Sequence, residues 1–295
     1  EHYREEPTRM KIMVKRNLKI YFQDKAAVFF SMLSVIIIFA LYIFFIGDSI
    51  SSGLKFLPHP NRLMRAWMLA GMLASASITT SLGAYGVMIS DRDNKTIKDF
   101  YSSPVSRRQI AGGYIITGFI ISIIMSIFTL IFGEIYMGMI GGAVLDMDIL
   151  LKLFGVIVLS AFASSAIASF IISFLKTNSA YSAASMIVGT LIGFLVGAYI
   201  PIGNLPENVQ WLVKYFPCAH SAVLYRQLLM KDSIKENFAN QPTAVLKETK
   251  EILGVVFVYN GHTASAWMSV AALLITGVVF YLLAVLVLIR KENEI

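Results

Sequence analysis

The chain has 295 residues, of which 57% are hydrophobic and only 15% are charged, and its formal net charge is +7. A soluble globular protein contains about 45–50% apolar and about 25% charged residues, so a chain this apolar cannot cover a water-facing surface with polar side chains. Its 20 glycines, 8 prolines and single cysteine exclude collagen-like, disordered and disulfide-rich proteins. The composition predicts a protein embedded in a lipid bilayer.

The chain begins with a basic segment, residues 1–25, in which residues 10–24 carry a helical pattern. Its apolar side chains are Val14, Leu18, Tyr21 and Phe22. A separate basic row consists of Lys11, Lys15 and Lys19. The pattern predicts an amphipathic helix that lies in the membrane interface with its apolar face in the acyl chains. A basic stretch beside the membrane, with no mechanical role, is the alternative.

Six windows of the sequence contain no Asp, Glu, Lys or Arg. They are residues 26–47, 66–90, 109–133, 154–175, 177–206 and 263–289. A helix needs about 20 apolar residues to cross the hydrocarbon layer, so each window is long enough, and the fifth must break near Pro201. We expect an all-α integral membrane protein with six transmembrane helices in one domain, residues 26–290, followed by a short tail, residues 291–295.

Basic residues gather on one side of these expected spans. Those before the first span are Arg4, Arg9, Lys11, Lys15, Arg16, Lys19 and Lys25, and those in the loop 91–108 are Arg92, Lys95, Lys98, Arg107 and Arg108. The loops 48–65 and 134–152 carry fewer. The positive-inside rule therefore places both termini in the cytoplasm. Because this bias accounts for most of the net charge, the charge does not argue for nucleic-acid binding.

Small residues recur every fourth position in two of the windows. The second window carries Gly71, Ser75, Thr79 and Gly83, and the fifth carries Gly189, Gly193 and Gly197. Such stripes let helix backbones approach closely in lipid. One interpretation is packing within the chain. The other is that the second and fifth helices form a subunit interface or a movable seam along a translocation path.

The loop 91–108 predicts a short helix that runs to about Ser103, with Asn94 or Asp93 as its cap. Pro104 ends this helix, and Ser106 can cap the third span. The side chains of Ile97, Phe100 and Tyr101 project from one face. An exposed apolar cluster of this kind predicts a docking surface, and packing against the protein's own helices is the alternative.

The loop 201–262 is the only candidate for an extramembrane subdomain. Residues 206–231 predict two short amphipathic helices broken at Pro217, the first with Val209, Leu212, Val213 and Phe216 on one face. Residues 243–253 predict another helix. We expect Cys218, in this loop, to be a buried small side chain.

Chemical motifs are absent from the sequence. It contains no P-loop motif and no cysteine or histidine pattern typical of a metal site, and adjacency alone does not make His220 and Ser221 a catalytic pair. We expect neither a catalytic residue nor a metal in this chain. The expected spans hold no carboxylate at depth, which disfavours proton or sodium coupling and indicates that energy comes from elsewhere.

Residues 90–110 resemble the cytoplasmic loop of type-2 ABC exporter permeases. The matching residues are Asp91-Arg92, Thr96 and Ser103-Pro104-Val105-Ser106, and Lys95 stands where glycine is usual. The N-terminal helix, the six spans and the segment Leu205-Pro206…Phe216-Pro217…Arg226 before the last span extend the resemblance over most of the chain.

This resemblance implies that the loop helix is a coupling helix seated on a separate ATPase subunit. The residues implied in coupling are Thr96, Ile97, Phe100, Tyr101, Ser103 and Pro104. It further implies two ATPase subunits, which hold ATP and Mg²⁺, a second permease subunit, identical or homologous, and a bacterial cytoplasmic membrane.

Span walls rich in Phe, Met, Ser and Thr without charge predict a hydrophobic or amphipathic substrate such as a drug, an antimicrobial peptide or a lipid. Export of a polysaccharide or glycolipid is one alternative, and a self-contained carrier or channel is another.

Overall fold

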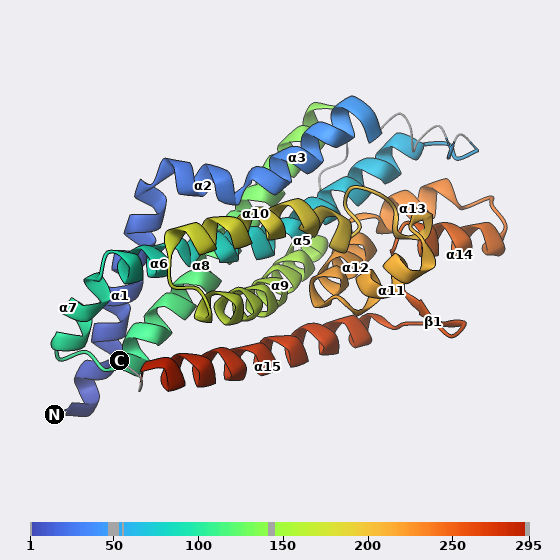
Figure 1. The fold of residues 1–295 in the computed structure, drawn as a ribbon. Helices are drawn as coiled ribbons and strands as arrows, with labels where there is room; N and C mark the ends of the chain where they lie inside the picture. The colour runs from blue at the N-terminus through green and yellow to red at the C-terminus, as the bar shows by residue number, and fades with distance from the viewer. Residues whose placement is uncertain (1, 47–52, 55, 141–144, 293–295) are drawn as a thin grey trace.

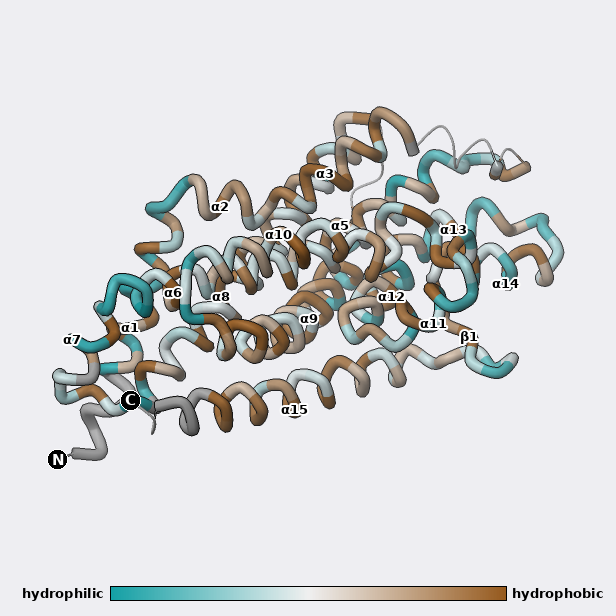
Figure 2. Tube along the Cα trace, viewed as in Figure 1, coloured by the Kyte–Doolittle hydropathy of each residue, from teal (hydrophilic) through white to brown (hydrophobic). Residues whose placement is uncertain are grey.

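Long helices run side by side along the molecule, and both chain ends lie at the same end of this bundle (Figure 1). The structure is a computed structural model that describes residues 2–46, 53–54, 56–140 and 145–292. We call the end that holds both chain ends and α7 the termini end, and the end that holds α11 to α14 the opposite end. Hydrophilic residues gather at these two ends, and hydrophobic ones lie between them (Figure 2).

The first half of the chain forms α1 (His2–Gln23), α2 (Lys25–Ser31), α3 (Leu33–Leu41), the π-helical turn η1 (Tyr42–Ile46), α5 (Pro60–Ala84), α6 (Gly86–Asp93), α7 (Thr96–Ser102) and α8 (Arg107–Met139). The second half forms α9 (Met147–Ser173), α10 (Asn178–Leu195), the 3₁₀ turn η2 (Ile202–Asn204), α11 (Glu207–Tyr215), α12 (Pro217–Leu229), α13 (Lys231–Asn237), α14 (Thr243–Ile252), β1 (Val258–Tyr259), β2 (His262–Thr263) and α15 (Ala266–Glu292). The two strands form a hairpin whose turn residues, Asn260 and Gly261, both have positive φ, as a tight hairpin turn requires.

Five helices of the described residues are long and apolar enough to cross a membrane, and a sixth span exists if α2 and α3, bent by 46°, are counted together. These segments overlap the six windows. The second is longer than predicted, because α5 and α6 together run over Pro60–Asp93. The predicted loop 91–108 therefore begins inside a helix.

The helix α5 occupies the centre of the bundle, where it packs against α8, α9, α12 and α3. Within its most apolar stretch 89% of the residues are buried, compared with 11% in α10. Runs of Ala, Gly and Ser along α5 explain its position, since small side chains let several helices approach one axis closely.

The N-terminal helix forms as predicted, but its predicted apolar face is only partly correct. Tyr21 is buried, whereas Phe22 is 42% exposed. The side chains that face the protein are those of Met13, Asn17 and Tyr21, because α1 packs along α8. Lys11, Lys15 and Lys19 are exposed, as the basic row predicts.

Two helices broken at Pro217 follow the fifth span, as predicted, and α14 ends within one residue of its predicted end. The predicted face of α11 is wrong in part, since Val213 is buried but Leu212 is 60% exposed. The second helix, α12, packs against α5, α9 and α15. It thereby joins the segment 201–262 to the bundle and carries polar side chains, including Arg226, into its interior.

Candidate functional site

The turn between α6 and α7 depends on Lys95, whose φ of 60° is left-handed. The predicted cap is wrong: neither Asn94 nor Asp93 caps α7, since Asn94 donates a hydrogen bond to Ser90 and Asp93 accepts one from Asn178. A left-handed backbone favours glycine, which is the residue that the resemblance leads one to expect here. The turn therefore keeps the geometry of that pattern while carrying a lysine.

The face of α7 that was predicted to dock a partner is partly covered by the protein itself. Ile97 and Phe100 are half-buried, and the Arg16 guanidinium lies 4.9 Å from the centre of the Phe100 ring. This contact agrees with the alternative of packing against the protein's own helices. Thr96 begins α7, and the side chain of Tyr101 lies outside the described residues.

The end of α7 is fixed by hydrogen bonds to both sides of the turn. Ser103 Oγ donates to the carbonyl of Phe100 at 2.6 Å, and Arg9 donates to the carbonyl of Pro104. Ser106 then caps α8 in a reciprocal pair with Gln109, which confirms the predicted cap.

A half-buried ion pair joins the N-terminal helix to the second span. The two terminal nitrogens of Arg16 donate to the two carboxylate oxygens of Asp91 at 2.6 and 2.7 Å, and Tyr114 donates to the same carboxylate at 2.5 Å. Asp91 is only 7% exposed, and its hydrogen bond raises the pKa of Arg16 above the ordinary value. These three residues, with Phe100 beneath the guanidinium, connect α1, α6, α7 and α8. We call this group the Arg16 node.

The small residues of α5 contact other segments of the same chain. A Cβ added at Gly71 would lie 2.7 Å from the Cβ of Ala198, and one added at Gly83 would lie 2.6 Å from that of Ser31. Ser75 is buried, and Thr79 accepts a hydrogen bond from Ser34. The stripe therefore packs within the chain, as the first interpretation has it.

The three glycines predicted as a stripe on the fifth span do not share a helix face. The helix α10 ends at Leu195, and Gly197, with a φ of 63°, lies beyond it. The N–H groups of Gly197 and Ala198 donate to the carbonyls of Phe194 and Gly193, the pattern of a Schellman helix end. A Cβ added at Gly193 would meet the Tyr199 ring, whereas Gly189 faces open space.

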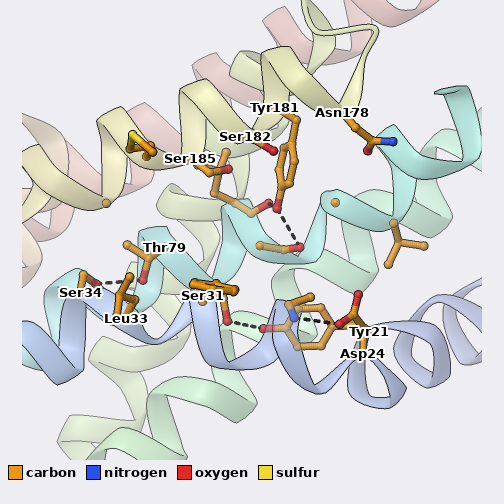
Figure 3. Close-up of a pocket in the computed structure, with 18 of the residues that line it drawn as sticks. Tyr21, Asp24, Ser31, Leu33, Ser34, Thr79, Asn178, Tyr181, Ser182 and Ser185 are labelled. Carbon is orange, nitrogen blue, oxygen red and sulfur yellow. Dashed lines mark hydrogen bonds between the residues drawn. The ribbon is translucent and has the colours of Figure 1, made fainter.

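Members of both stripes meet at a cleft of about 610 Å³, bounded by the end of α1, α2, α3, α5, α6 and α10 (Figure 3). Thr79, Gly83 and Gly189 line it together. Its other polar lining residues are Tyr21, Asp24, Ser31, Ser34, Ser90, Asn178, Tyr181, Ser182, Ser185 and Thr190. Its larger apolar lining residues are Ile20, Phe30, Leu33, Ile37, Leu82, Val87 and Met186. The lining therefore combines hydroxyl and amide groups with an apolar wall.

Hydrogen bonds hold the cleft walls in place. Tyr21 is bonded to Ser31 at 2.7 Å, and Tyr181 donates to the carbonyls of Leu82 and Gly83 at 3.3 Å. The two tyrosines come from opposite walls (Figure 3). The cleft is thus a mixed polar and apolar space beside the bent pair α2 and α3.

Comparison with protein families identifies the family to which the chain belongs. The model of the family described as ABC-2 family transporter protein matches residues 58–286. The chain belongs to this family. It is an ABC-2 type permease, the membrane-embedded transport subunit of an ABC transporter, and the resemblance of residues 90–110 is confirmed. No curated protein gives a significant match.

The match begins just before α5, so α1, α2 and α3 of the permease precede the matched residues. The Arg16 node and the cleft each join this preceding segment to helices that the match covers.

At the opposite end, the permease fully buries Arg226, the arginine of the segment that extends the resemblance, and neither its burial nor its partners were predicted from the sequence. Arg226 on α12 is 0% exposed and lies over the Trp67 ring at 5.3 Å. Its terminal nitrogens donate to the carbonyls of Val196, Gly197 and Gly254. Among the described residues, Arg226 forms no ion pair with a carboxylate.

The C-terminal ends of two helices supply negative charge to Arg226 in place of a carboxylate. Gly254, with a φ of 65°, ends α14 in the same Schellman pattern that Gly197 forms after α10. The C-terminus of a helix carries about −0.5 elementary charge and unsatisfied carbonyls. Two such ends converge on one guanidinium, which explains how a cation is held there. We call this group the Arg226 cradle.

The remaining candidate groups of the permease are structural. His220 is bonded to Ser269 at 3.1 Å, while Ser221 donates to the carbonyl of Cys218, so the adjacent pair is not a dyad. Cys218 is buried, as predicted. Across the described ranges, no group of three or more His, Cys, Asp or Glu residues could hold a metal ion.

Proposed function

We propose that this permease exports a hydrophobic or amphipathic substrate and that ATP hydrolysis on separate ATPase subunits drives it. The observation that carries the proposal is the Arg16 node. The node connects α7 to α1 and α6. The family resemblance places the ATPase contact on α7.

The elements bound by the node continue directly into the cleft walls. Ile20 and Tyr21 belong to α1, and Val87 and Ser90 belong to α6, and all four line the cleft. A displacement of α7 is therefore transmitted to the cleft through short, hydrogen-bonded connections. We assign Thr96, Ile97, Phe100, Tyr101, Ser103 and Pro104 to this ATPase contact.

The proposed assembly contains two permeases, identical or homologous, and two ATPase subunits that hold ATP and Mg²⁺. Support for a second permease comes from α10, whose membrane-length face is largely uncovered in the single chain. Exposed residues of α10 that do not line the cleft include Ala183, Ile187 and Leu191, so another helix can pack there.

The proposed location is the bacterial cytoplasmic membrane, with both termini in the cytoplasm. Both chain ends lie at the same end of the bundle (Figure 1), and the exposed Lys11, Lys15 and Lys19 lie on α1 at that end. Both observations agree with the orientation that the positive-inside rule gives. In this orientation α1 rests on the bundle by one face and presents its lysines to lipid headgroups.

The test is reconstitution of the permease with its partner ATPase in inside-out vesicles. We expect ATP-dependent uptake of a fluorescent amphiphile, and we expect Asp91→Asn to abolish it while the ATPase still binds. Asp99→Asn, on the exposed side of α7, is the matched control and leaves uptake unchanged. Uptake by the permease alone, without ATP, would instead identify a self-contained carrier, and uptake restricted to glycolipids would identify a glycan exporter.

A further inference from the structure

The helix α2 separates two cavities of different chemistry. On one side lies the cleft, and on the other lies a groove of about 520 Å³ between α2, α3 and α8. The groove is lined by Phe22, Lys25, Val28, Phe29, Met32, Val35, Ile36, Phe39, Met125, Phe128 and Phe132. Asp24 and Lys25 are consecutive, yet Asp24 faces the cleft and Lys25 faces the groove. The two cavities therefore carry formal charges of opposite sign.

The cleft is negative at its termini end. Among the described residues, Asp24 is the one lining residue with a formal charge, and no Lys, Arg or His lines the cleft. Asp24 accepts a hydrogen bond from the backbone of Ala27 and, within the described residues, forms no ion pair. A second carboxylate, that of Asp93, lies next to the lining residue Asn178, which donates a hydrogen bond to it at 2.6 Å.

Aromatic rings and aliphatic side chains complete the chemistry of the cleft. Tyr181, which is half-buried, and Phe30, which is exposed, line the cleft, and Tyr21 comes from the opposite wall to Tyr181 with its side chain buried (Figure 3). Aromatic faces attract organic cations, whereas Leu33 and Ile37 offer apolar contact along the rest of the wall.

We infer that the cleft binds hydrophobic organic cations, with Asp24 as their counter-charge. A carboxylate exposed to a mixed polar and apolar cavity favours a cation whose charge is spread over apolar groups, because such a cation loses little hydration when it contacts the apolar wall. This inference names the substrate class of the proposed exporter and rests on that proposed function, although binding itself needs neither ATP nor the ATPase.

The probes for the test are tetraphenylphosphonium and tetraphenylborate, which have nearly the same shape and opposite charge. Binding of each is measured to the full chain in phosphatidylcholine nanodiscs, with empty nanodiscs subtracted to remove partitioning into lipid. Asp24→Asn removes the charge and keeps the side-chain acceptor that caps α2, since Asn caps helices as well as Asp does. Asp24→Glu keeps the charge, and Lys25→Gln is the matched control on the other cavity.

We expect Asp24→Asn to weaken tetraphenylphosphonium binding by about tenfold and to leave tetraphenylborate binding unchanged or tighter. We expect Asp24→Glu to bind the phosphonium within about threefold of the wild type, and Lys25→Gln to bind it as the wild type does. Equal phosphonium binding by wild type and Asp24→Asn, or equal losses for both probes, would overturn the inference.

The same probes separate this inference from the proposed function. Selective phosphonium binding without ATP-driven movement in the reconstituted complex would contradict the proposed function and leave the binding site standing. ATP-driven movement of an uncharged amphiphile, together with no effect of Asp24→Asn on phosphonium binding, would contradict this inference and leave the proposed function standing.

Discussion

The two ends of the bundle hold an arginine in different ways. At the termini end, Arg16 binds a carboxylate, Asp91, and the side chain remains 30% exposed. At the opposite end, Arg226 is fully buried, lies over the Trp67 ring and, among the described residues, donates its hydrogen bonds to main-chain carbonyls at the ends of α10 and α14. A side-chain pair can break and re-form while the backbone stays intact, whereas a helix end cannot move without the helix. We therefore expect the connection at the termini end to move more readily than the one at the opposite end.

The largest effect should come from replacement of Arg226 in the Arg226 cradle. Arg226→Met leaves three buried carbonyls without their donor, and each unsatisfied group costs about 1–3 kcal/mol. We expect the permease to lose about 3 kcal/mol or more of its free energy of unfolding, measured by thermal denaturation in detergent. Gln227→Met, which removes one hydrogen bond to Val255 from a partly buried neighbour, is the control. A stable Arg226→Met protein would show that the cradle does not hold the two helix ends.

Replacement of each arginine by lysine should separate the two modes of binding. Arg226 uses two terminal nitrogens that point at different helix ends, and a lysine, as a point charge, cannot reproduce that fork. We expect Arg226→Lys to cost about 2 kcal/mol and Arg16→Lys, which keeps a charge beside Asp91, to cost less than about 1 kcal/mol. Thermal midpoints of the two variants provide the check. Equal losses would mean that the two arginines are held alike.

Removal of the Phe100 ring should loosen α7 from the Arg16 node. Phe100→Ala removes the contact with the guanidinium and part of the packing against α1, so we expect a loss of about 1 kcal/mol. ATPase stimulation by substrate should fall in the reconstituted complex. Lys98→Ala, on the exposed side of α7, should change neither quantity. If both variants behave as wild type, α7 does not act through this ring.

The smallest effect should be a gain at Lys95. Its left-handed backbone is costly for a residue with a side chain, so Lys95→Gly should stabilise the permease by about 0.5 kcal/mol. Lys98→Gly, inside α7 where φ is helical, should destabilise it by about 1 kcal/mol. Destabilisation by Lys95→Gly would show that the lysine side chain contributes contacts that exceed its strain.

Local signals in the sequence predicted the elements well. The charge-free windows located the spans because burying a charge in lipid is costly, Pro217 marked the break between α11 and α12, and Ser106 with Gln109 marked the start of α8. The hairpin at Asn260-Gly261 also carries a local signal, a turn dipeptide typical of tight hairpins, which the loop assignment overlooked.

Tertiary arrangement could not be predicted in the same way. The stripe ending at Gly197 has helical spacing, but the window 177–206 is longer than one span, and a glycine near its end is typical of a helix terminus. Asp91 follows directly on the second window, yet nothing local indicates that Arg16 is its partner. Arg226 could not be assigned a place from the sequence, because the carbonyls that hold it come from two helix ends far apart along the chain.

The Arg16 node is the proposed connection between α7 and the cleft, and exchange of its two charges tests that connection. ATP-dependent uptake by the reconstituted complex is compared for Arg16→Asp, for Asp91→Arg and for the protein that carries both. We predict that each single variant loses uptake, because each places two like charges together. We predict that the double variant regains a substantial part of the uptake. Uptake that is normal in the single variants, or absent from a double variant that still assembles with the ATPase, would contradict the proposed connection.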